Sequence, residues 1–293
     1  MAGCSLNDDE CSMNVAAHVA ANVAAPKENL TAASRRQLIL ERLLALVCLA
    51  APFLAAALMT GTAAALVGPA RLAPELEPYV VTVLNRSGDS SGFCTGSVIS
   101  PTVVLTAAHC VGAPDDTRIF FKDAKGAPVL VETAAVAINP GFRPDAIRRR
   151  ITSIDLALVL LAEPLPSAFT PVEIAKGALP TPGQKFLIAG FGVADEAQGK
   201  TGGILRSGIL VDTGPKSSVL LWAADPARSG LGACTGDSGA PLLSFDRPAV
   251  VAVAVWAKGQ GGNHCGALTQ AVLVAPQRHW IETTMNAWSA AAR

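Results

Sequence analysis

Short apolar runs rich in β-branched residues recur along the chain from residue 66 onward, and Gly, Pro, Asn and Asp separate them. Many short runs at this spacing are typical of strands in an all-β barrel or sandwich. The predicted strands are Tyr79–Leu84, Val98–Ile99, Val103–Leu105, Arg118–Phe121, Leu156–Leu161, Lys185–Ala189, Ile209–Val211, Val219–Leu221, Val250–Val255 and Ala271–Val274. Residues 276–288 have helical spacing with a proline at a plausible first-turn position, which predicts one terminal helix that closes a β domain.

The charge balance excludes nucleic acid as an expected partner. Lys and Arg total 23 and Asp and Glu total 23, and no segment concentrates enough basic residues to follow a nucleic-acid backbone. Hydrophobic residues make up 51% of the 293 and charged residues 16%, which excludes intrinsic disorder of the whole chain.

The first 65 residues of the chain are interpreted as a leader followed by a targeting segment. Residues 1–33 are rich in Ala, Asn and short polar residues and are predicted to be a disordered leader. A 25-residue run without a charge, Leu43–Val67, is long enough to cross a bilayer core of about 30 Å. Because Ala63–Ala65 satisfies the small-x-small rule of a signal-peptidase site, residues 34–65 are predicted to be a cleaved export signal, with an uncleaved membrane anchor as the alternative.

The start of this signal contains paired arginines. Ser34–Ile39 resembles the twin-arginine signal of bacterial export, since it keeps the serine, both arginines and the following apolar pair. Leu40 replaces the expected lysine, and two arginines in an ordinary signal are the alternative interpretation. We therefore expect an exported protein, periplasmic or secreted, or a membrane-anchored one with its main domain outside the cytoplasm.

Three local sequences hold candidate catalytic residues. His109 follows a predicted strand and small residues, Asp155 stands at the head of an apolar strand, and Ser238 lies in the glycine-rich turn Gly236–Gly239. Taken singly, each has a structural explanation. In the order His, Asp, Ser, separated by 46 and 83 residues, they resemble the chymotrypsin/trypsin family of serine proteases across nearly all of residues 66–293.

The resemblance implies a fold of two six-stranded antiparallel Greek-key β-barrels with a C-terminal α-helix. The N-terminal barrel would cover about 66–170, the C-terminal barrel about 171–275 and the helix about 276–288. Together with the arginine pair, it points to a bacterial-type exported member. We expect a monomer that acts on peptide or protein substrates, without cofactor or metal, and that meets a membrane only through an uncleaved signal.

The resemblance also assigns roles to the catalytic residues. A serine hydroxyl needs a base to take its proton during attack, so Ser238 would be the nucleophile and His109, with an intrinsic pKa of about 6.5, the base. Asp155 would hold the other ring nitrogen, and the backbone N–H groups of Gly236 and Ser238 would form the oxyanion hole. A catalytically weak or inactive binding protein on the same fold is the alternative, although this chain keeps the residues that inactive relatives usually lose.

Activation of the family links the chain terminus to the site. Activated members begin Ile-Val-Gly-Gly, and the new amine pairs with the aspartate before the serine. Leu66–Pro69 reads Leu-Val-Gly-Pro here, which implies an ion pair between the Leu66 amine and Asp237. Since the signal-peptidase rule nominates the same bond after Ala65, we expect signal removal itself to create the activating terminus.

The specificity pocket is expected to be neutral and to suit a small to medium apolar side chain. Gly232 would be its floor, where trypsin-like members carry Asp. The residues that the resemblance assigns to the pocket are Gly232, Ala233, Val255, Trp256, Ala257 and Thr269. Val255 stands where the family usually has a serine that hydrogen-bonds the catalytic aspartate, so Asp155 would lack one donor.

An odd cysteine count becomes even after signal removal. Three of the seven cysteines precede the predicted cleavage, and the remaining four allow three pairings. The resemblance selects Cys94–Cys110 and Cys234–Cys265, and both bonds would need an oxidising compartment.

Two other groups of residues have surface interpretations. Arg148–Arg150 is predicted to be a solvated loop, with an autolysis site or a patch for an anionic partner as alternatives. His264 is interpreted as a surface histidine, with an approach to the pocket rim as the alternative.

Overall fold

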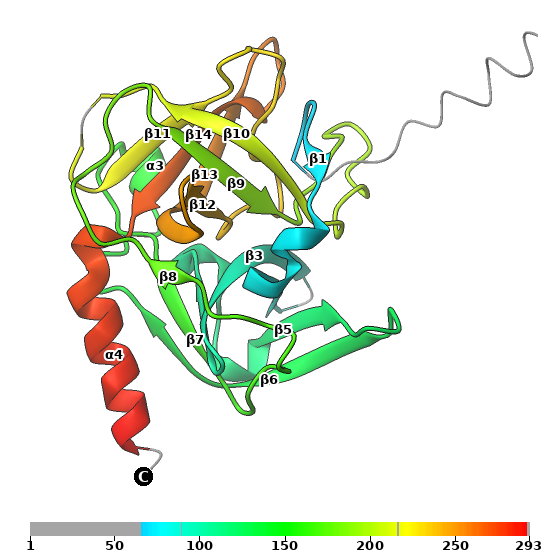
Figure 1. Ribbon diagram of the computed structural model, residues 1–293, viewed down its shortest axis with the longest axis vertical. Coiled ribbons are helices and arrows are strands. Elements are labelled where there is room, and N and C mark those ends of the chain that lie inside the picture. Colours follow the sequence, from blue (N-terminus) through cyan, green and yellow to red (C-terminus); the bar gives the residue numbers. More distant parts are fainter. Residues whose placement is uncertain (1–65, 89, 216, 292–293) are drawn as a thin grey trace, which may run out of the picture. The chain divides into compact units, whose positions relative to one another are not determined.

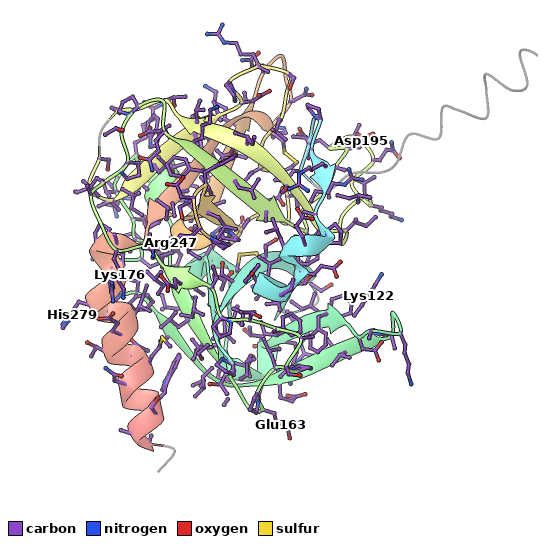
Figure 2. All side chains as sticks on the ribbon, viewed as in Figure 1. Lys122, Glu163, Lys176, Asp195, Arg247 and His279 are labelled. Carbon is purple, nitrogen blue, oxygen red and sulfur yellow. A yellow bond between two sulfur atoms is a disulfide. The ribbon has the colours of Figure 1, made fainter. Side chains whose placement is uncertain are left out.

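A computed structural model describes residues 66–88, 90–215 and 217–291 (Figure 1). The predicted leader, the export signal and three of the cysteines lie outside the described residues. The described chain forms two barrels and a terminal helix, with charged side chains such as Lys122, Glu163 and Lys176 at its surface (Figure 2).

The first barrel is a closed ring of six antiparallel strands in the order β2-β3-β4-β7-β6-β5, closed by pairing of β5 with β2. Its strands are β2 (Val80–Ser87), β3 (Ser90–Ser100), β4 (Val103–Thr106), β5 (Thr117–Lys122), β6 (Pro128–Ile138) and β7 (Ala157–Leu161).

The second barrel repeats this strand order. Its ring runs β9-β10-β11-β14-β13-β12, and β9 pairs with both β10 and β12. Its strands are β9 (Lys185–Gly190), β10 (Arg206–Asp212), β11 (Leu220–Ala224), β12 (Pro241–Ser244), β13 (Ala249–Gly259) and β14 (Gly266–Leu273). The predicted fold of two six-stranded antiparallel Greek-key barrels is therefore confirmed.

Several strands of the first barrel are apolar on both faces. In β4, Val104 points into the barrel core, whereas Val103 and Leu105 belong to a second cluster. In β7, Val159 fills the barrel and Leu158 joins that second cluster. Alternate residues of a strand face opposite sides, so a continuous apolar run shows that both sides are covered.

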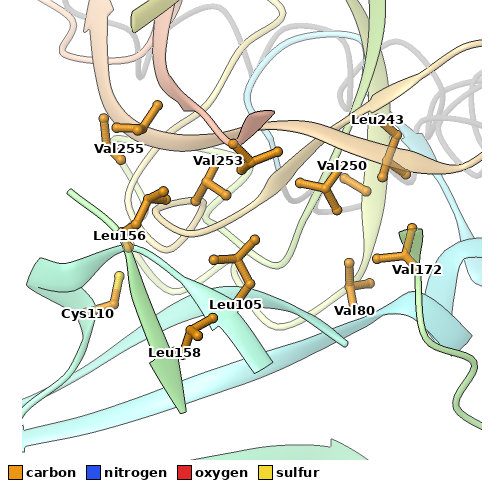
Figure 3. Close-up of a cluster of buried hydrophobic side chains, with 14 of the residues drawn as sticks. Val80, Leu105, Cys110, Leu156, Leu158, Val172, Leu243, Val250, Val253 and Val255 are labelled. Carbon is orange, nitrogen blue, oxygen red and sulfur yellow. The ribbon is translucent and has the colours of Figure 1, made fainter. Parts of the chain in front are cut away.

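The second cluster joins the two barrels. Leu105, Leu156 and Leu158 of the first barrel pack with Val250 and Val253 of β13, and their side chains point toward one another in Figure 3. This apolar contact holds together the two halves that carry the candidate catalytic residues.

The first residues of the domain, which the predicted boundary of 66–170 groups with the first barrel, pair with strands and loops of the second. Val67 and Gly232 exchange backbone hydrogen bonds of 3.2 and 3.3 Å, and the short strand β1 (Arg71–Leu72) pairs with β10. The cause is the burial of Leu66, which is fully enclosed in the core of the second barrel.

The remaining elements are short, apart from the terminal helix. Strand β8 (Glu173–Ile174) pairs parallel with β13, and β1, β6, β8 and β12 were not predicted. The helices are η1 (Pro74–Tyr79), η2 (Ala108–Cys110), η3 (Pro114–Asp116), α3 (Ala146–Arg149), η4 (Ala275–Gln277) and α4 (Arg278–Ala291). The predicted terminal helix thus begins with a 3₁₀ turn. Ile281 is the buried residue of α4 and packs in the cluster between the barrels. Among the described residues, no helix has the length and apolar character needed to cross a bilayer.

Candidate active site

His109 lies on the 3₁₀ turn η2, immediately after β4. The Cys94–Cys110 disulfide fastens this turn to β3, as the resemblance implied. The neighbouring Ala108 and Cys110 are buried, while the imidazole stays 39% exposed. The turn is therefore anchored on both sides of a histidine that reaches solvent.

Asp155 binds His109 through both carboxylate oxygens. Oδ2 lies 2.7 Å from Nδ1 of the ring, and Oδ1 accepts the backbone N–H of His109 at 3.0 Å. Two contacts to one residue fix the imidazole relative to the carboxylate. Val255 carries no hydroxyl to donate, and the backbone N–H of His109 supplies a second donor to the aspartate.

Ser238 lies half-buried in a turn built on two glycines in the left-handed region, Gly236 with φ +94° and Gly239 with φ +84°. Within the described residues, the N–H groups of Asp237, Gly239 and Ala240 donate to backbone carbonyls, whereas those of Gly236 and Ser238 donate to none. The two N–H groups predicted to form an oxyanion hole are therefore available to a ligand.

Thr95 of β3 ties this turn to the first barrel. Its N–H donates to the Ser238 carbonyl at 2.8 Å, and its hydroxyl donates to the Gly236 carbonyl at 3.0 Å. The same hydroxyl accepts the N–H of Phe191 at 3.0 Å. Sequence reasoning missed Thr95, because only the packing of β3 against the second barrel gives its hydroxyl these partners.

We expect Thr95→Val to lower both stability and kcat, because it leaves the partly buried Phe191 N–H and the buried Gly236 carbonyl without the Thr95 hydroxyl as partner. The loss of unfolding free energy should be about 2 kcal/mol, the usual cost of unsatisfied buried groups. Thr95→Ser keeps the hydroxyl and is the matched control. Urea unfolding and kcat for a peptide substrate check the prediction, and equal values for the Val and Ser variants would contradict it.

Asp237, the residue before the serine, is completely buried. Its Oδ1 accepts the N–H of Gly192 at 2.8 Å and its Oδ2 that of Cys234 at 2.9 Å. Burial raises the pKa of Asp237 to about 7, against the opposing effect of these two hydrogen bonds. No cation pairs with this carboxyl among the described residues, so at neutral pH it is only partly ionised.

The raised pKa of Asp237 predicts a stability that falls with rising pH in the chain that retains the residues before Leu66. The contribution is fully present below pH 3.8 and is lost as the pH rises to about 7. A pKa shift of this size corresponds to about 4 kcal/mol of unfolding free energy. We expect Asp237→Asn to remove this component, so the stability of the unsubstituted chain relative to the variant should decline between pH 4 and 8. Urea unfolding at both pH values measures it, and a constant difference would contradict the prediction.

One cleft of about 1380 Å³ collects the three candidate catalytic residues, because His109, Asp155 and Ser238 all line it. No hydrogen bond joins His109 to Ser238 in the described part of the chain. Such bonds are often long in unliganded enzymes and tighten only with substrate. The volume exceeds the roughly 300–1,000 Å³ of small-molecule sites and suits a longer ligand.

The predicted pocket residues divide into two groups. Val255, Trp256 and Ala257 on β13 line the cleft. Gly232, Ala233 and Thr269 are buried and are not in its lining, because they bond within the barrel. The Ala233 N–H donates to the Thr269 hydroxyl at 3.1 Å, for example, and Gly232 pairs with Val67. These three residues therefore lie within the second barrel and do not face the cleft.

Several lining residues were missed by sequence reasoning. Trp222 and Gln270 are register partners on β11 and β14 and both line the cleft. Leu220 lines it as well, two residues before Trp222 and on the same face of β11. Trp222 and Gln270 lie just outside the predicted strands Val219–Leu221 and Ala271–Val274, so no period of two was visible there. Only the pairing of β11 with β14 shows which face meets the cleft. His264 also lines the cleft, which supports the alternative interpretation of that residue.

The second predicted disulfide, Cys234–Cys265, is present and joins the serine turn to the loop before β14. Two clusters have metal-ligating residue types, Cys94, His109 and Cys110, and Glu196, Cys234 and Cys265. Their sulfur atoms are held in disulfides and are not free thiolates, which are the form that ligates metals.

Comparison with known proteins identifies the family. The family model named Trypsin matches residues 66–281. The chain belongs to the trypsin family. It is therefore a member of a family of serine endopeptidases, with the fold that family implies.

Named relatives come from animals. The chain is 30% identical over 241 residues to trypsin epsilon of Drosophila erecta, covering 75% of this chain and 87% of that protein. It is 29% identical over 171 residues to the cercarial protease of Schistosoma mansoni, covering 51% of this chain and 65% of that protein. These relatives give no support to the bacterial-type assignment drawn from the paired arginines.

A solved structure shows the same fold. A scabies mite inactivated protease paralogue matches with a TM-score of 0.61 and 21% identity, covering 75% of this chain and 99% of that one. At this identity the likeness concerns the fold alone.

Proposed function

We propose that the protein is an exported serine endopeptidase that hydrolyses peptide bonds through an acyl-enzyme on Ser238. The observation that carries this proposal is the bonding of Asp155 to His109 on the wall of the cleft that Ser238 also lines. With Nδ1–H held by the carboxylate, Nε2 is left to take the proton of the attacking hydroxyl and later to give it to the leaving amine.

The oxyanion that forms on the scissile carbonyl would be bound by the N–H groups of Gly236 and Ser238. Their lack of other partners among the described residues supports this role. Gly236 is required at its position, since a Cβ there would lie 2.3 Å from the Phe93 ring and its φ is +94°. Fixed donors of this kind need no reorganisation as charge develops.

Activation would follow from removal of the signal after Ala65. The new amine of Leu66 would supply the cation that Asp237 lacks among the described residues. The burial of Leu66 in a cluster that also contains Ala240, close to Asp237 in sequence, supports this pairing. N-terminal sequencing of the exported protein should give Leu-Val-Gly-Pro, and any other first residue would overturn this step. While the pH is below the pKa of this amine, the amine is charged and stabilises the ionised carboxylate. The fall in stability with rising pH that we predict for Asp237 in the uncleaved chain should then disappear.

Primary specificity would be neutral, for a small to medium apolar side chain beside Val255, Trp256 and Ala257. The absence of any carboxylate from this group of residues supports the proposal. Cleavage of a peptide library should show an apolar residue before the scissile bond, and a preference for Arg or Lys there would contradict it.

A fluorophosphonate probe tests the proposed activity. The protein purified after export from a secreting host should become covalently labelled at Ser238, and Ser238→Ala should abolish the label. Exposed Ser91, changed to Ala, is the matched control and should label normally. An unlabelled but folded protein would instead favour the second candidate function, a binding protein on the same fold. The missing hydrogen bond between His109 and Ser238 in the described structure is the observation in favour of that candidate.

A further inference from the structure

The charges along the cleft are predominantly positive. Apart from the His109–Asp155 pair, the charged or titratable side chains in its lining are those of Arg143, Arg150, Lys258 and His264. Among the described residues Asp155 is the one carboxylate in the lining, and His109 already engages both of its oxygens.

Two of these cations have no carboxylate partner within the described residues. Arg150 and Lys258 are exposed and form no ion pair there. By contrast, Arg148 and Arg149, beside Arg150 in sequence, approach Asp145 at 3.9 and 3.3 Å and do not line the cleft. The positive charge of the cleft is therefore not neutralised by this neighbouring carboxylate.

Two other charged side chains near the rim, those of Arg143 and Glu196, form hydrogen bonds with backbone groups. Arg143 donates to the carbonyls of Pro140 and Phe142 at 2.9 and 2.8 Å. Glu196, a carboxylate behind the rim, accepts the backbone N–H groups of the two residues 264 and 265 at 2.9–3.2 Å. Arg150 from the first barrel and Lys258 from the second are thus the two lining cations with neither a carboxylate partner nor a side-chain hydrogen bond among the described residues.

The course of β13 indicates where along a substrate these cations act. Ala254 bonds to the residues after Ser238, through Gly239 N–H at 2.7 Å and the Ala240 carbonyl at 2.9 Å. Strand β12 pairs no further than Val253, so residues 255–258 extend beyond it and away from Ser238. A peptide added antiparallel along this edge would run toward Ser238, and the residue beside Lys258 would precede the scissile bond by about three positions at roughly 3.3 Å per residue.

We propose that the cleft selects peptides with an acidic residue two to four positions before the scissile bond, held between Arg150 and Lys258. This inference rests on the proposed function, since it concerns the same cleft. Complementary charge raises the rate of encounter and disfavours substrates with a cation at that place.

Peptides that differ only by Glu, Gln or Lys at one of these positions test the inference. At low ionic strength we expect kcat/KM to be about fivefold to tenfold higher for the best Glu peptide than for its Gln partner, and lowest for Lys. The ratio should shrink in 0.5 M salt, because exposed charges are screened. Arg150→Gln combined with Lys258→Gln should bring the ratio close to one. Arg148→Gln removes one charge outside the cleft lining and should leave it unchanged.

Binding to the Ser238→Ala variant separates this inference from the proposed function. Dissociation constants of the same peptides should follow the order Glu, Gln, Lys, with Glu tightest. Equal constants for Glu and Gln would overturn the charge preference. An unsubstituted protein that binds in this order but cleaves no peptide would overturn the proposed function and sustain the charge preference.

Discussion

Asp155→Asn should lower kcat by about 10⁴-fold, the size known for this substitution in the trypsin family. The structure gives the reason. Oδ1 of Asp155 accepts the backbone N–H of His109, a donor that cannot change. An asparagine would keep its carbonyl there and turn its amide N–H₂ toward Nδ1. Nδ1 would then have to accept a hydrogen bond from that amide, so the ring proton would move to Nε2. A protonated Nε2 could no longer take the proton of Ser238.

The measurement is kcat for a cleaved peptide, together with thermal unfolding to show that the variant is folded. Asp145→Asn, a change in the same barrel at a residue that does not line the cleft, is the control and should retain full activity. A loss of less than tenfold in Asp155→Asn would show that His109 finds the correct tautomer without the carboxylate, against the proposed mechanism.

Gly239→Ala should destabilise the protein by about 4 kcal/mol, the largest effect on stability that we expect from adding one methyl group. A Cβ at Gly239 would lie 2.0 Å from the Thr95 carbonyl oxygen and 2.2 Å from the Thr106 hydroxyl. Relief of that clash must push the serine turn away from β3. About 1–2 kcal/mol comes from the left-handed backbone and about 1–3 from overpacking.

Gly126→Ala is the matched control for this substitution. Gly126 also has a positive φ, +78°, but no atom lies within 4 Å of the Cβ position. We therefore expect this variant to lose only the backbone part, about 1–2 kcal/mol. Denaturant unfolding of both variants isolates the contact, and equal losses would show that the serine turn can move away from β3 without cost.

Local chemistry explains how far the sequence could predict the site. The turn around Ser238 depends on glycines adjacent to it, and Asp155 and His109 stand at the ends of apolar strands, so all three are visible in short stretches of sequence. Thr95 and Gln270 acquire their roles from strands distant in the chain. Nothing in the residues around them indicates which strand they will meet.

The fold was predictable where strands are densely apolar. β4 and β7 are apolar on both faces and were found. β6 contains Glu132 and Thr133 and shifts register between Thr133 and Ala135, so its pattern is diluted. β12 has four residues and begins with Pro241. The resemblance, not the local pattern, led us to expect Leu66 near Asp237. The pairing of β1 with β10 had no local signal, because the two strands are distant in the chain.

The apolar cluster between the barrels means that neither half is complete by itself. Separated from its neighbour, the first barrel would expose Leu105, Leu156 and Leu158 to water, and the second would expose Val250 and Val253. Such surfaces favour aggregation over independent folding. The chain should therefore unfold as one cooperative unit, in which His109 and Ser238 lose their common cleft in the same transition that melts either barrel.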